Sequence, residues 1–313
     1  SGATLVWGKN DDVLAQPLDA EGRAQGKPVT IARKARAREI AAVGDAGRLA
    51  VAWLHVDGAG AEVWAAVRTK DGFEEPVSLG PSEAVRVGRR GHVAVGVGRA
   101  GKLIAFHRGA REPCEYGKPE PCASFGMHEL PGRGGEPTRP RLAVPKPCEG
   151  GVIGVVLAGE HLHYGVCAID GAQASSTVFT TQPEPPYAQA QELLRGCTPL
   201  GMTALDSRDV WVVGSCSGKR TGVLLRGIDA ASPMTDLSNV ELRCEKERPI
   251  LALAQNRVLA DPVAGIAPLL PTSLAPLGAR AVWTGSALIV AHPAAGELTL
   301  TRYRCVGGLF IKA

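Results

Sequence analysis

Three short runs decide the fold: Leu49-Ala-Val-Ala-Trp53, Val63-Trp-Ala-Ala-Val-Arg-Thr-Lys-Asp71 and Glu75-Pro-Val-Ser-Leu79. Each run has the length and apolar content of a β-strand, and turn residues such as Gly, Asp or Pro separate it from the next. The same series recurs along the chain: an apolar run that ends in an aromatic residue, a second run that ends at Asp, and a weaker extended piece. Leu5-Val-Trp7 and Leu103-Ile-Ala-Phe106 are further copies of the first run. The pattern predicts short antiparallel strands.

Four short strands that recur about every 45 residues are typical of a β-propeller. Ile40-Ala-Ala-Val43 and His92-Val-Ala-Val-Gly-Val97 are candidates for innermost strands. We therefore expect an all-β chain in which residues 1–313 form one β-propeller domain with six or seven four-stranded antiparallel blades. A pair of β-sandwich domains is the alternative.

Three segments interrupt the regular pattern. Residues 109–147 form a long insertion in the repeat, and residues 250–275 are either a degenerate blade or another insertion. Residues 188–195, Ala-Gln-Ala-Gln-Glu-Leu-Leu-Arg, have a composition that favours two turns of helix. Long loops inside repeat proteins often carry function, so residues 109–147 are a candidate binding element. The alternative is a loop that a disulfide holds in place and that has no function of its own.

Residues 5–29 carry an apolar-Trp strand, an Ala-Gln-Pro-Leu-Asp run and a Gly-Lys-Pro-Val piece. This stretch resembles the repeat of secreted or lipid-anchored bacterial β-propellers of largely uncharacterised function. The likeness is recognisable again at residues 63–79 and is poor beyond them. Pro17 stands where the repeat usually has a basic residue. The resemblance implies a propeller fold and export, and it implies no particular activity.

Composition excludes several classes of protein. Lys+Arg 35 against Asp+Glu 31 leaves a formal net charge of +4, which is too weak a bias to indicate a nucleic-acid partner. A hydrophobic fraction of 45% with 21% charged residues is typical of a globular chain rather than a disordered one. No uncharged apolar run is long enough for a transmembrane segment. Residues 3–7 read as a strand rather than a signal peptide, so we expect any targeting segment to be cleaved, omitted or absent.

Eight cysteines form no CxxC pair, which disfavours a zinc ribbon or a thioredoxin-like site. Two pairs with equal spacing bracket predicted β-hairpins, whose ends lie side by side; a third pair closes a Pro-rich loop, and the fourth follows by elimination. The four expected disulfides are Cys148–Cys167, Cys197–Cys216, Cys114–Cys122 and Cys244–Cys305. Disulfides persist in oxidising compartments, so we expect an extracytoplasmic location: periplasmic, cell-surface or secreted. Buried free thiols in a cytosolic protein are the alternative.

Three motifs that resemble catalytic or metal sites fit structural roles better. Residues 96–101 match GxGxxG, but a strand follows where a dinucleotide site needs a helix. Gly214-Ser-Cys-Ser-Gly218 resembles a nucleophile elbow, yet it also leads into a strand, and Cys216 is an expected disulfide partner. His161 and His163 lie two apart on one strand face, but no third metal ligand accompanies them. We therefore predict no catalytic residue, metal or cofactor.

Two groups of residues are candidates for binding. The basic run Arg33-Lys-Ala-Arg36-Ala-Arg38 and a similar cluster one repeat later supply cations that would gather on one face, where they would attract an anionic ligand or acidic partner. A solvated basic rim without a partner is the alternative. The predicted binding residues are Arg36, Arg38, Arg86 and Arg90 from this rim, with Tyr116, Lys118 and Phe125 from the insertion.

These observations favour a non-catalytic, extracytoplasmic scaffold that binds a protein or glycan of the cell envelope through its face loops. The alternative is a glycan-cleaving enzyme, a hydrolase or lyase, with two carboxylates near the central channel. A third interpretation is a fixed subunit of a larger envelope or extracellular complex, which predicts a large apolar patch on one face.

Overall fold

The computed structural model describes the following residues: 2–58, 60–83, 91–112, 122–130, 142–144, 147–170, 173–181, 188–204, 209–226, 230–245, 248–252, 257–259, 269–270, 279–294 and 297–313. Two compact units divide the chain. Unit 1 comprises Ser1–Leu5, Gln16–Lys27 and Leu200–Ala313, and unit 2 comprises Val6–Ala15 and Pro28–Pro199. The first sheet draws on both units and has the order β1 (Ala3–Lys9), β2 (Asp12–Leu18), β3 (Val29–Ala32).

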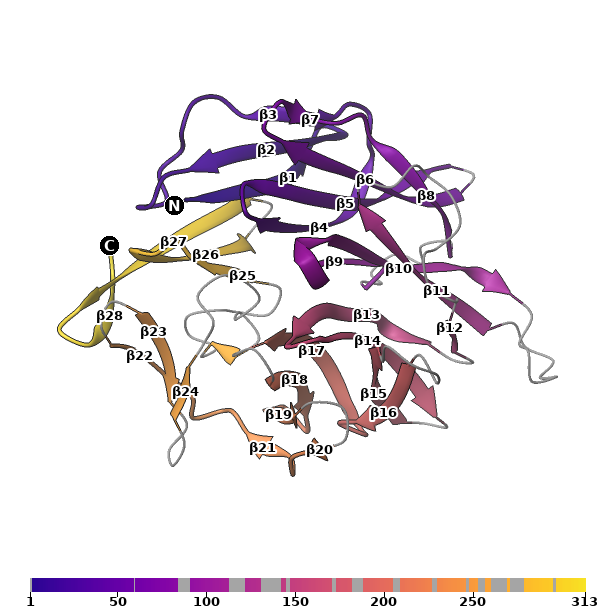
Figure 1. Ribbon diagram of the computed structural model, residues 1–313, viewed down its shortest axis with the longest axis vertical. Coiled ribbons are helices and arrows are strands. Elements are labelled where there is room, and N and C mark those ends of the chain that lie inside the picture. The colour runs from indigo at the N-terminus through magenta and orange to yellow at the C-terminus, as the bar shows by residue number, and fades with distance from the viewer. Residues whose placement is uncertain are drawn as a thin grey trace. The chain divides into compact units, whose positions relative to one another are not determined.

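Unit 2 contains three further antiparallel sheets, each an up-and-down meander (Figure 1). The sheet that follows β3 has the strands β4 (Ala37–Asp45), β5 (Arg48–Asp57), β6 (Gly60–Thr69), β7 (Gly72–Phe73) and β8 (Val77–Ser82). The next has β9 (Val93–Val97), β10 (Leu103–Glu112), β11 (Cys122–Leu130) and β12 (Leu142–Val144), with the single-turn 3-10 helix η1 (Arg99–Gly101) before β10. The last has β13 (Pro147–Ala158), β14 (His161–Asp170), β15 (Gln173–Thr181) and β16 (Ala188–Leu193).

Unit 1 contains two sheets. One has the strands β17 (Cys197–Ala204), β18 (Asp209–Cys216), β19 (Lys219–Arg226), β20 (Ala230–Ala231) and β21 (Thr235–Asp236); the first three residues of β17 belong to unit 2. The other joins seven strands in the order β24-β23-β22-β28-β27-β26-β25. Their bounds are β22 (Glu241–Glu245), β23 (Arg248–Ala252), β24 (Arg257–Leu259), β25 (Arg280–Trp283), β26 (Ala287–Ala294), β27 (Glu297–Val306) and β28 (Leu309–Lys312).

The described strands thus form six antiparallel sheets that follow one another along the chain, and the described part contains no α-helix. This confirms the predicted all-β propeller class. The helix expected over residues 188–195 is wrong, because β16 is a strand that pairs with β15 from Ser176↔Leu193 to Thr181↔Ala188. Backbone pairing to a neighbouring strand outweighs the helix propensity of this Ala- and Gln-rich run.

The described parts of the two irregular segments belong to these sheets. Within residues 109–147, β11 pairs with β10 from Leu103↔Leu130 onward, and β12 pairs with β11. These described residues supply the two outer strands of their sheet. That the remaining residues form an insertion stays a prediction. Within residues 250–275, β23 and β24 extend the sheet of β22, and Leu270 is fully buried in the core of unit 1. That residues 1–313 form one domain remains a prediction.

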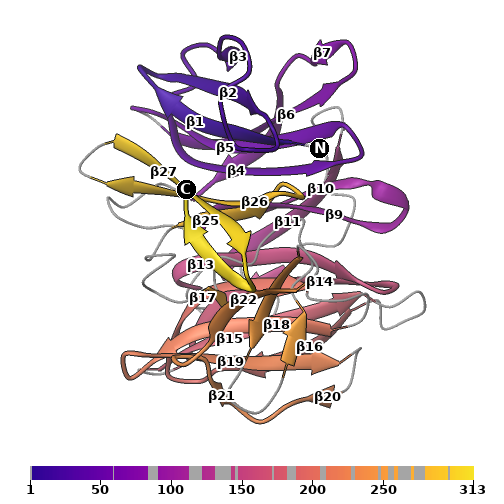
Figure 2. The same ribbon diagram turned by 90° about the vertical axis from the view of Figure 1, so that its left-hand side faces the viewer.

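Apolar side chains on both strand faces build the core of unit 2. In β5, Ala50, Ala52 and Leu54 pack toward the β9–β12 sheet, whereas the alternate residues Val51 and Trp53 pack toward the β1–β3 strands. Figure 2 shows the ribbons of β1, β2, β4 and β5. This double burial explains why Leu49-Ala-Val-Ala-Trp53 lacks polar alternation. β9 and β13 approach closely, since a Cβ at Gly96 would lie 2.4 Å from the carbonyl oxygen of Val155. Glycine is required there for steric reasons.

Disulfides reinforce the sheets. Cys244 and Cys305 form the predicted long-range bond across 61 residues, with their Cα atoms 5.9 Å apart. Cys197 and Cys216 are both disulfide-bonded, and no described cysteine is free. The predicted pairs Cys114–Cys122 and Cys148–Cys167 each include a side chain outside the described part, although Cys167 is itself disulfide-bonded. The described part contains no helix with the length and hydropathy of a membrane span.

Candidate functional site

Residues 33–36 connect β3 to β4, and residues 37 and 38 begin β4. We call residues 33–38 the basic loop. The N–H of Lys34 donates to Oδ1 of Asp12 at 2.9 Å. The N–H of Arg36 donates to the carbonyl oxygen of Asp11, also at 2.9 Å. Both loop residues have positive φ, 52° and 42°, a conformation that non-glycine residues adopt rarely and at a cost. The hydrogen bonds from the β1–β2 turn hold the loop in this shape.

Ala35 anchors the centre of the basic loop. Its side chain is 5% exposed and packs in the apolar cluster with Ile31 and Trp53. Nδ1 of His55 lies 2.6 Å from the carbonyl oxygen of Ala35, so this ring nitrogen donates to it. The loop is therefore held by a buried methyl group and by three hydrogen bonds, and it presents its other side chains outward.

Four cations project from this loop: Arg33, Lys34, Arg36 and Arg38 are all exposed. Within the described residues none of them forms an ion pair or donates a side-chain hydrogen bond. Like charges on one short segment repel one another, and the repulsion is relieved when an anion binds between them. The loop thus presents a pre-organised set of donors that suits carboxylate, sulfate or phosphate groups.

The remaining predicted binding residues divide into two groups. Arg86, Arg90, Tyr116 and Lys118 lie outside the described residues. Phe125 is described, and its assignment to a binding surface is wrong: the side chain is 1% exposed. It lies in the core between two sheets, where its ring stacks on Phe106 at a centroid distance of 5.9 Å. The strand alternation of β11 turns it inward, which the interpretation of this segment as a loop did not anticipate.

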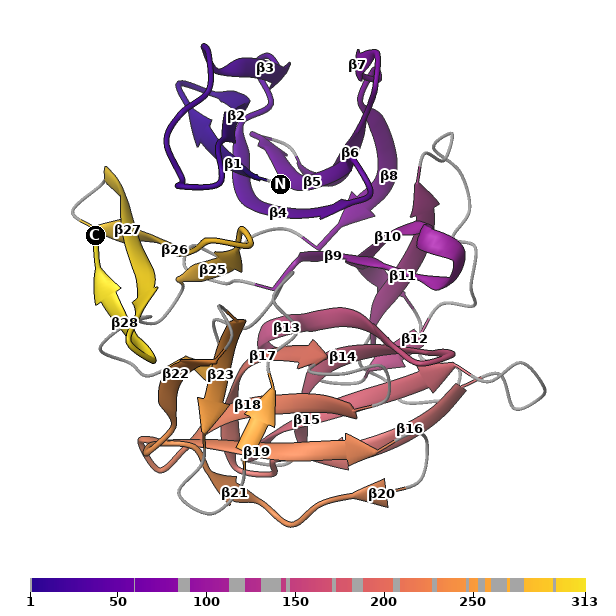
Figure 3. The same ribbon diagram turned by 60° about the vertical axis from the view of Figure 1, so that its left-hand side comes forward.

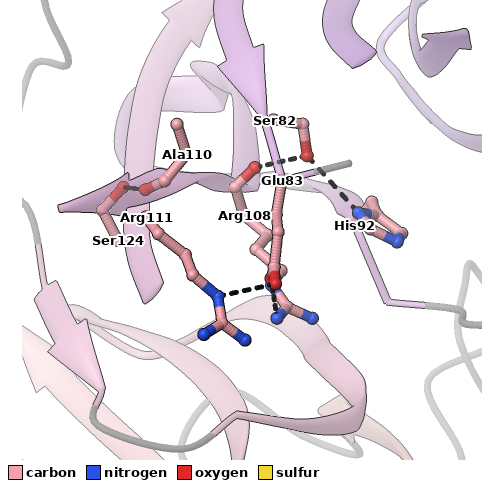
Figure 4. A network of polar contacts seen from close by, with 7 residues as sticks. All are labelled: Ser82, Glu83, His92, Arg108, Ala110, Arg111 and Ser124. Atoms are coloured by element: carbon pink, nitrogen blue, oxygen red, sulfur yellow. Dashed lines mark hydrogen bonds and ion pairs between the residues drawn. The ribbon is translucent and has the colours of Figure 1, made fainter. Parts of the chain in front are cut away.

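A second cluster of charge in unit 2 is buried, and sequence reasoning missed it. Arg108 is 0% exposed, in β10, and its guanidinium pairs with the carboxylate of Glu83. Arg111 pairs with the other oxygen of that carboxylate at 2.8 Å. Figure 4 shows Glu83 between the two guanidinium groups. A Cβ added at Gly151 in β13 would lie 3.4 Å from Arg108, so the cluster also packs against the following sheet.

Three buried histidines, at positions 92, 107 and 128, form hydrogen bonds beside this cluster, in two branches that meet at the carbonyl oxygen of Arg108. Oγ of Ser82 donates to the carbonyl oxygen of Arg108 at 2.9 Å and therefore accepts from Nδ1 of His92 at 3.3 Å. Nδ1 of His107 lies 3.3 Å from the same carbonyl oxygen and carries its hydrogen. Nε2 of His107 is then the acceptor for Nε2 of His128, 3.0 Å away. Within this network, the contacts fix which nitrogen of each ring donates.

The carboxylates near these strands have structural partners. Glu39, on β4, accepts the backbone N–H groups of Gly91, His92 and Val93 at 3.1 to 3.5 Å. Glu83 is shared by two guanidinium groups. General acid or nucleophilic chemistry needs a carboxyl oxygen that faces substrate. These two carboxylates instead join neighbouring sheets of unit 2.

The motifs set aside in the sequence occupy structural positions. The GxGxxG match forms η1 and the turn between the antiparallel strands β9 and β10. Cys216, at the end of β18, is disulfide-bonded. His163 in β14 is fully buried, and Thr180 Oγ1 lies 3.0 Å from its Nδ1. Burial, followed by the charge of His161, lowers the pKa of His163 to about 4. No group of three metal-ligating side chains occurs among the described residues.

No family model matches the chain, and no curated protein matches it. Among solved structures, a Mycobacterium tuberculosis puromycin-hydrolyzing peptidase is similar, with a TM-score of 0.50 and 13% identity. The likeness covers 98% of this chain and 52% of the peptidase, so the chain spans about half its length. The Hadza microbial sialidase Hz136 has a TM-score of 0.48 at 12% identity, over 96% of this chain and 65% of that one. The Aleuria aurantia lectin has a TM-score of 0.45 at 11% identity, over 88% and 94%.

These similar structures include both a glycan-binding lectin and hydrolases. At identities of 11 to 13% such likeness concerns the fold alone. Of these three structures, the peptidase has a TM-score of 0.50, and the propeller class of this chain rests on its six consecutive antiparallel sheets.

Proposed function

We propose that this protein is a non-catalytic, extracytoplasmic binding propeller that engages an acidic partner, a protein or glycan of the cell envelope, through the basic loop. One observation carries the proposal: four exposed cations, with no ion-pair partner among the described residues, stand on a backbone that buried contacts hold in place. Pre-organisation reduces the entropy lost when a ligand binds. The disulfides support an oxidising compartment.

The chemistry of the loop favours binding over turnover. Guanidinium groups recognise carboxylates and sulfates through paired N–H donors, and three of the four cations are arginines. Catalysis of glycan cleavage would require two carboxyl groups directed at one sugar, whereas the two carboxylates Glu39 and Glu83 hold backbone amides and guanidinium groups. The proposed role therefore rests on complementary charge and shape.

Charge reversal tests the proposal. The double variant Arg36→Glu/Arg38→Glu is compared with Lys70→Glu/Lys219→Glu, which reverses two exposed cations elsewhere. Binding to immobilised dextran sulfate and to poly-glutamate is measured by biolayer interferometry at low and high salt. We expect the loop variant to weaken binding of at least one probe about tenfold or more at low salt, and the control to change it about twofold at most.

Preference for dextran sulfate would indicate a glycan partner, and preference for poly-glutamate would indicate an acidic protein. Equal losses in the two double variants would reject the basic loop as the site, because binding would then depend on total charge alone. Unchanged binding in the loop variant would reject it as well.

A further inference from the structure

His55, in β5, contacts the backbone of the basic loop and also an acidic side chain. Its Nδ1 is 2.6 Å from the carbonyl oxygen of Ala35. Its Nε2 is 3.9 Å from Oδ2 of Asp57, two residues further along the same strand. The side chain of His55 is 25% exposed, so its ring exchanges protons with solvent. One imidazole thus lies between the loop and a carboxylate.

The two contacts of the ring differ in what they require. A carbonyl oxygen only accepts hydrogen bonds, so Nδ1 of His55 carries a hydrogen whether the ring is neutral or charged. In the neutral ring, Nε2 then carries a lone pair, which the nearby carboxylate of Asp57 repels. A proton on Nε2 replaces that repulsion with an ion pair. Protonation therefore adds a favourable contact at Nε2 and keeps the one at Nδ1.

A second carboxylate lies on the neighbouring strand. β5 lies between β4 and β6 in its sheet (Figure 3), and Glu62 on β6 is directly opposite His55 in the register. Residues in such a pair lie on one face of the sheet, with their Cβ atoms about 5 Å apart. The carboxylate of Glu62 accepts from Nε1 of Trp64 at 2.8 Å and from Oγ of Ser78, which fixes its position. This negative charge therefore stays close to the ring.

Further charged groups near His55 belong to the basic loop and to the turn that holds it. On β4, the residue opposite His55 is Ala37, which stands between two of the loop arginines in the sequence. The β1–β2 turn contributes Asp12, whose Oδ1 accepts from the N–H of Lys34 at 2.9 Å. The charged groups of these elements and of β5 and β6 beside the ring are the acids Asp11, Asp12, Asp57 and Glu62 and the cations Arg33, Lys34, Arg36 and Arg38.

The charge of His55 changes the attraction of the loop for an anion. While the ring is neutral, the carboxylates of Asp57 and Glu62 weaken the positive field of the loop. A proton on Nε2 adds one positive charge next to the loop and pairs with Asp57, so the field becomes more positive. The hydrogen bond from Nδ1 to Ala35 is then charge-assisted and stronger, and it holds the loop backbone more firmly. Both effects favour tighter binding of an anion at lower pH.

We propose that His55 is a pH sensor of the basic loop, so that the loop holds a sulfated or carboxylated partner more tightly when this ring is protonated. The inference rests on the proposed function, since it concerns the regulation of the same site. Histidine changes its charge between about pH 5 and 8, whereas carboxylates and sulfate esters stay largely ionised over that range. The pH response therefore belongs to this protein and not to its partner.

Binding of immobilised dextran sulfate at pH 7.5 and at pH 5.5, at one low ionic strength, tests the inference. Sulfate esters are ionised at both values, so a change in affinity reports the protein. One added charge close to the site should raise the affinity of the unaltered chain about threefold or more on acidification. The control His161→Asn removes a histidine of β14, which belongs to a different sheet from the loop, and should keep this response.

Two variants at the sensor should reduce the response. His55→Asn places an amide N–H close to the position of Nδ1, so it still donates to Ala35, but it takes up no proton. Its affinity should change less than about 1.5-fold between the two pH values. Asp57→Asn removes the carboxylate that favours the charged ring, so it should bind more tightly than the unaltered chain at pH 7.5 and respond less to acid. Circular dichroism at both values checks that each variant is folded.

The outcomes separate this inference from the proposed function. Equal affinity of the unaltered chain at pH 7.5 and 5.5 would overturn the sensor and leave the binding role standing. A response of His55→Asn as large as that of His161→Asn would also overturn it, because other groups would then carry the pH dependence. Binding that Arg36→Glu/Arg38→Glu leaves unchanged would reject the proposed function itself, and the sensor with it.

Discussion

Arginines in unit 2 occupy two opposite environments. Arg36 and Arg38 in the basic loop are exposed and make no ion pair in the described part of the chain. Arg108 is fully buried, and Glu83 forms ion pairs with both Arg108 and Arg111. A buried guanidinium requires a carboxylate because desolvation is expensive. An exposed one is hydrated and remains available to a ligand. Exposure and pairing therefore separate the cations that hold sheets together from those we propose to bind a partner.

The largest effect on stability should come from Glu83→Gln. This change removes the charge that Arg108 faces inside the protein, and breaking a buried pair costs roughly 3–5 kcal/mol. Urea unfolding measures the free energy. The control is Glu129→Gln, which removes an exposed pair with Lys102 at 2.7 Å and should cost less than about 1 kcal/mol. Similar losses in both variants would contradict a structural role for the buried cluster.

Acid should destabilise the fold through the buried imidazole of His163. Burial lowers the pKa of His163 to about 4, below its ordinary value near 6.5 in an unfolded chain. The stabilisation is complete above about pH 6.5 and is lost as the pH falls toward 4, for a total of about 3 kcal/mol. Urea unfolding between pH 7 and 4 measures this slope. His163→Leu should flatten the profile, and an unchanged profile would exclude this group as its source.

Loosening the basic loop should have an intermediate effect. Asp12→Ala removes the acceptor for the N–H of Lys34 and should cost about 1 kcal/mol of stability. The four cations remain, so any loss of polyanion binding then reports lost pre-organisation rather than lost charge. Parallel measurements of unfolding and of dextran sulfate binding separate the two. Unchanged binding of dextran sulfate would mean that recognition does not need the hydrogen bond by which Asp12 holds the loop backbone.

The smallest effect on stability should come from the exposed arginines themselves. Arg36→Ala and Arg38→Ala should change the free energy of unfolding by less than about 0.5 kcal/mol, since neither side chain has a described partner. Their effect on polyanion binding should nonetheless exceed that of Asp12→Ala. Destabilisation comparable to that of Glu83→Gln would erase the distinction between the two groups of arginines.

Strands were predictable where local signals agree. Leu49-Ala-Val-Ala-Trp53 lies within β5, and Leu103-Ile-Ala-Phe106 opens β10, because apolar runs bounded by turn residues have few other stable conformations. The prediction of a helix over residues 188–195 was wrong because it relied on local propensity alone. In the structure, residues 188–193 pair with β15 as a strand. The prediction that Phe125 lies on a binding surface was wrong because we interpreted its segment as a loop. The segment contains the strand β11, which buries the side chain.

The sequence by itself determined the strand repeat, the basic run and the Cys244–Cys305 bond, since each depends on local pattern or on counting cysteines. Only the tertiary structure decided which charges are buried. Arg108 and the histidines at 92, 107 and 128 meet through the register of neighbouring strands in the β9–β12 sheet, and Glu83 reaches Arg108 from the end of β8 in the preceding sheet. No local signal encodes these arrangements. Burial arises from packing between distant segments, so a side chain's neighbours, rather than its type, decide whether its charge stabilises the fold or remains available for a ligand.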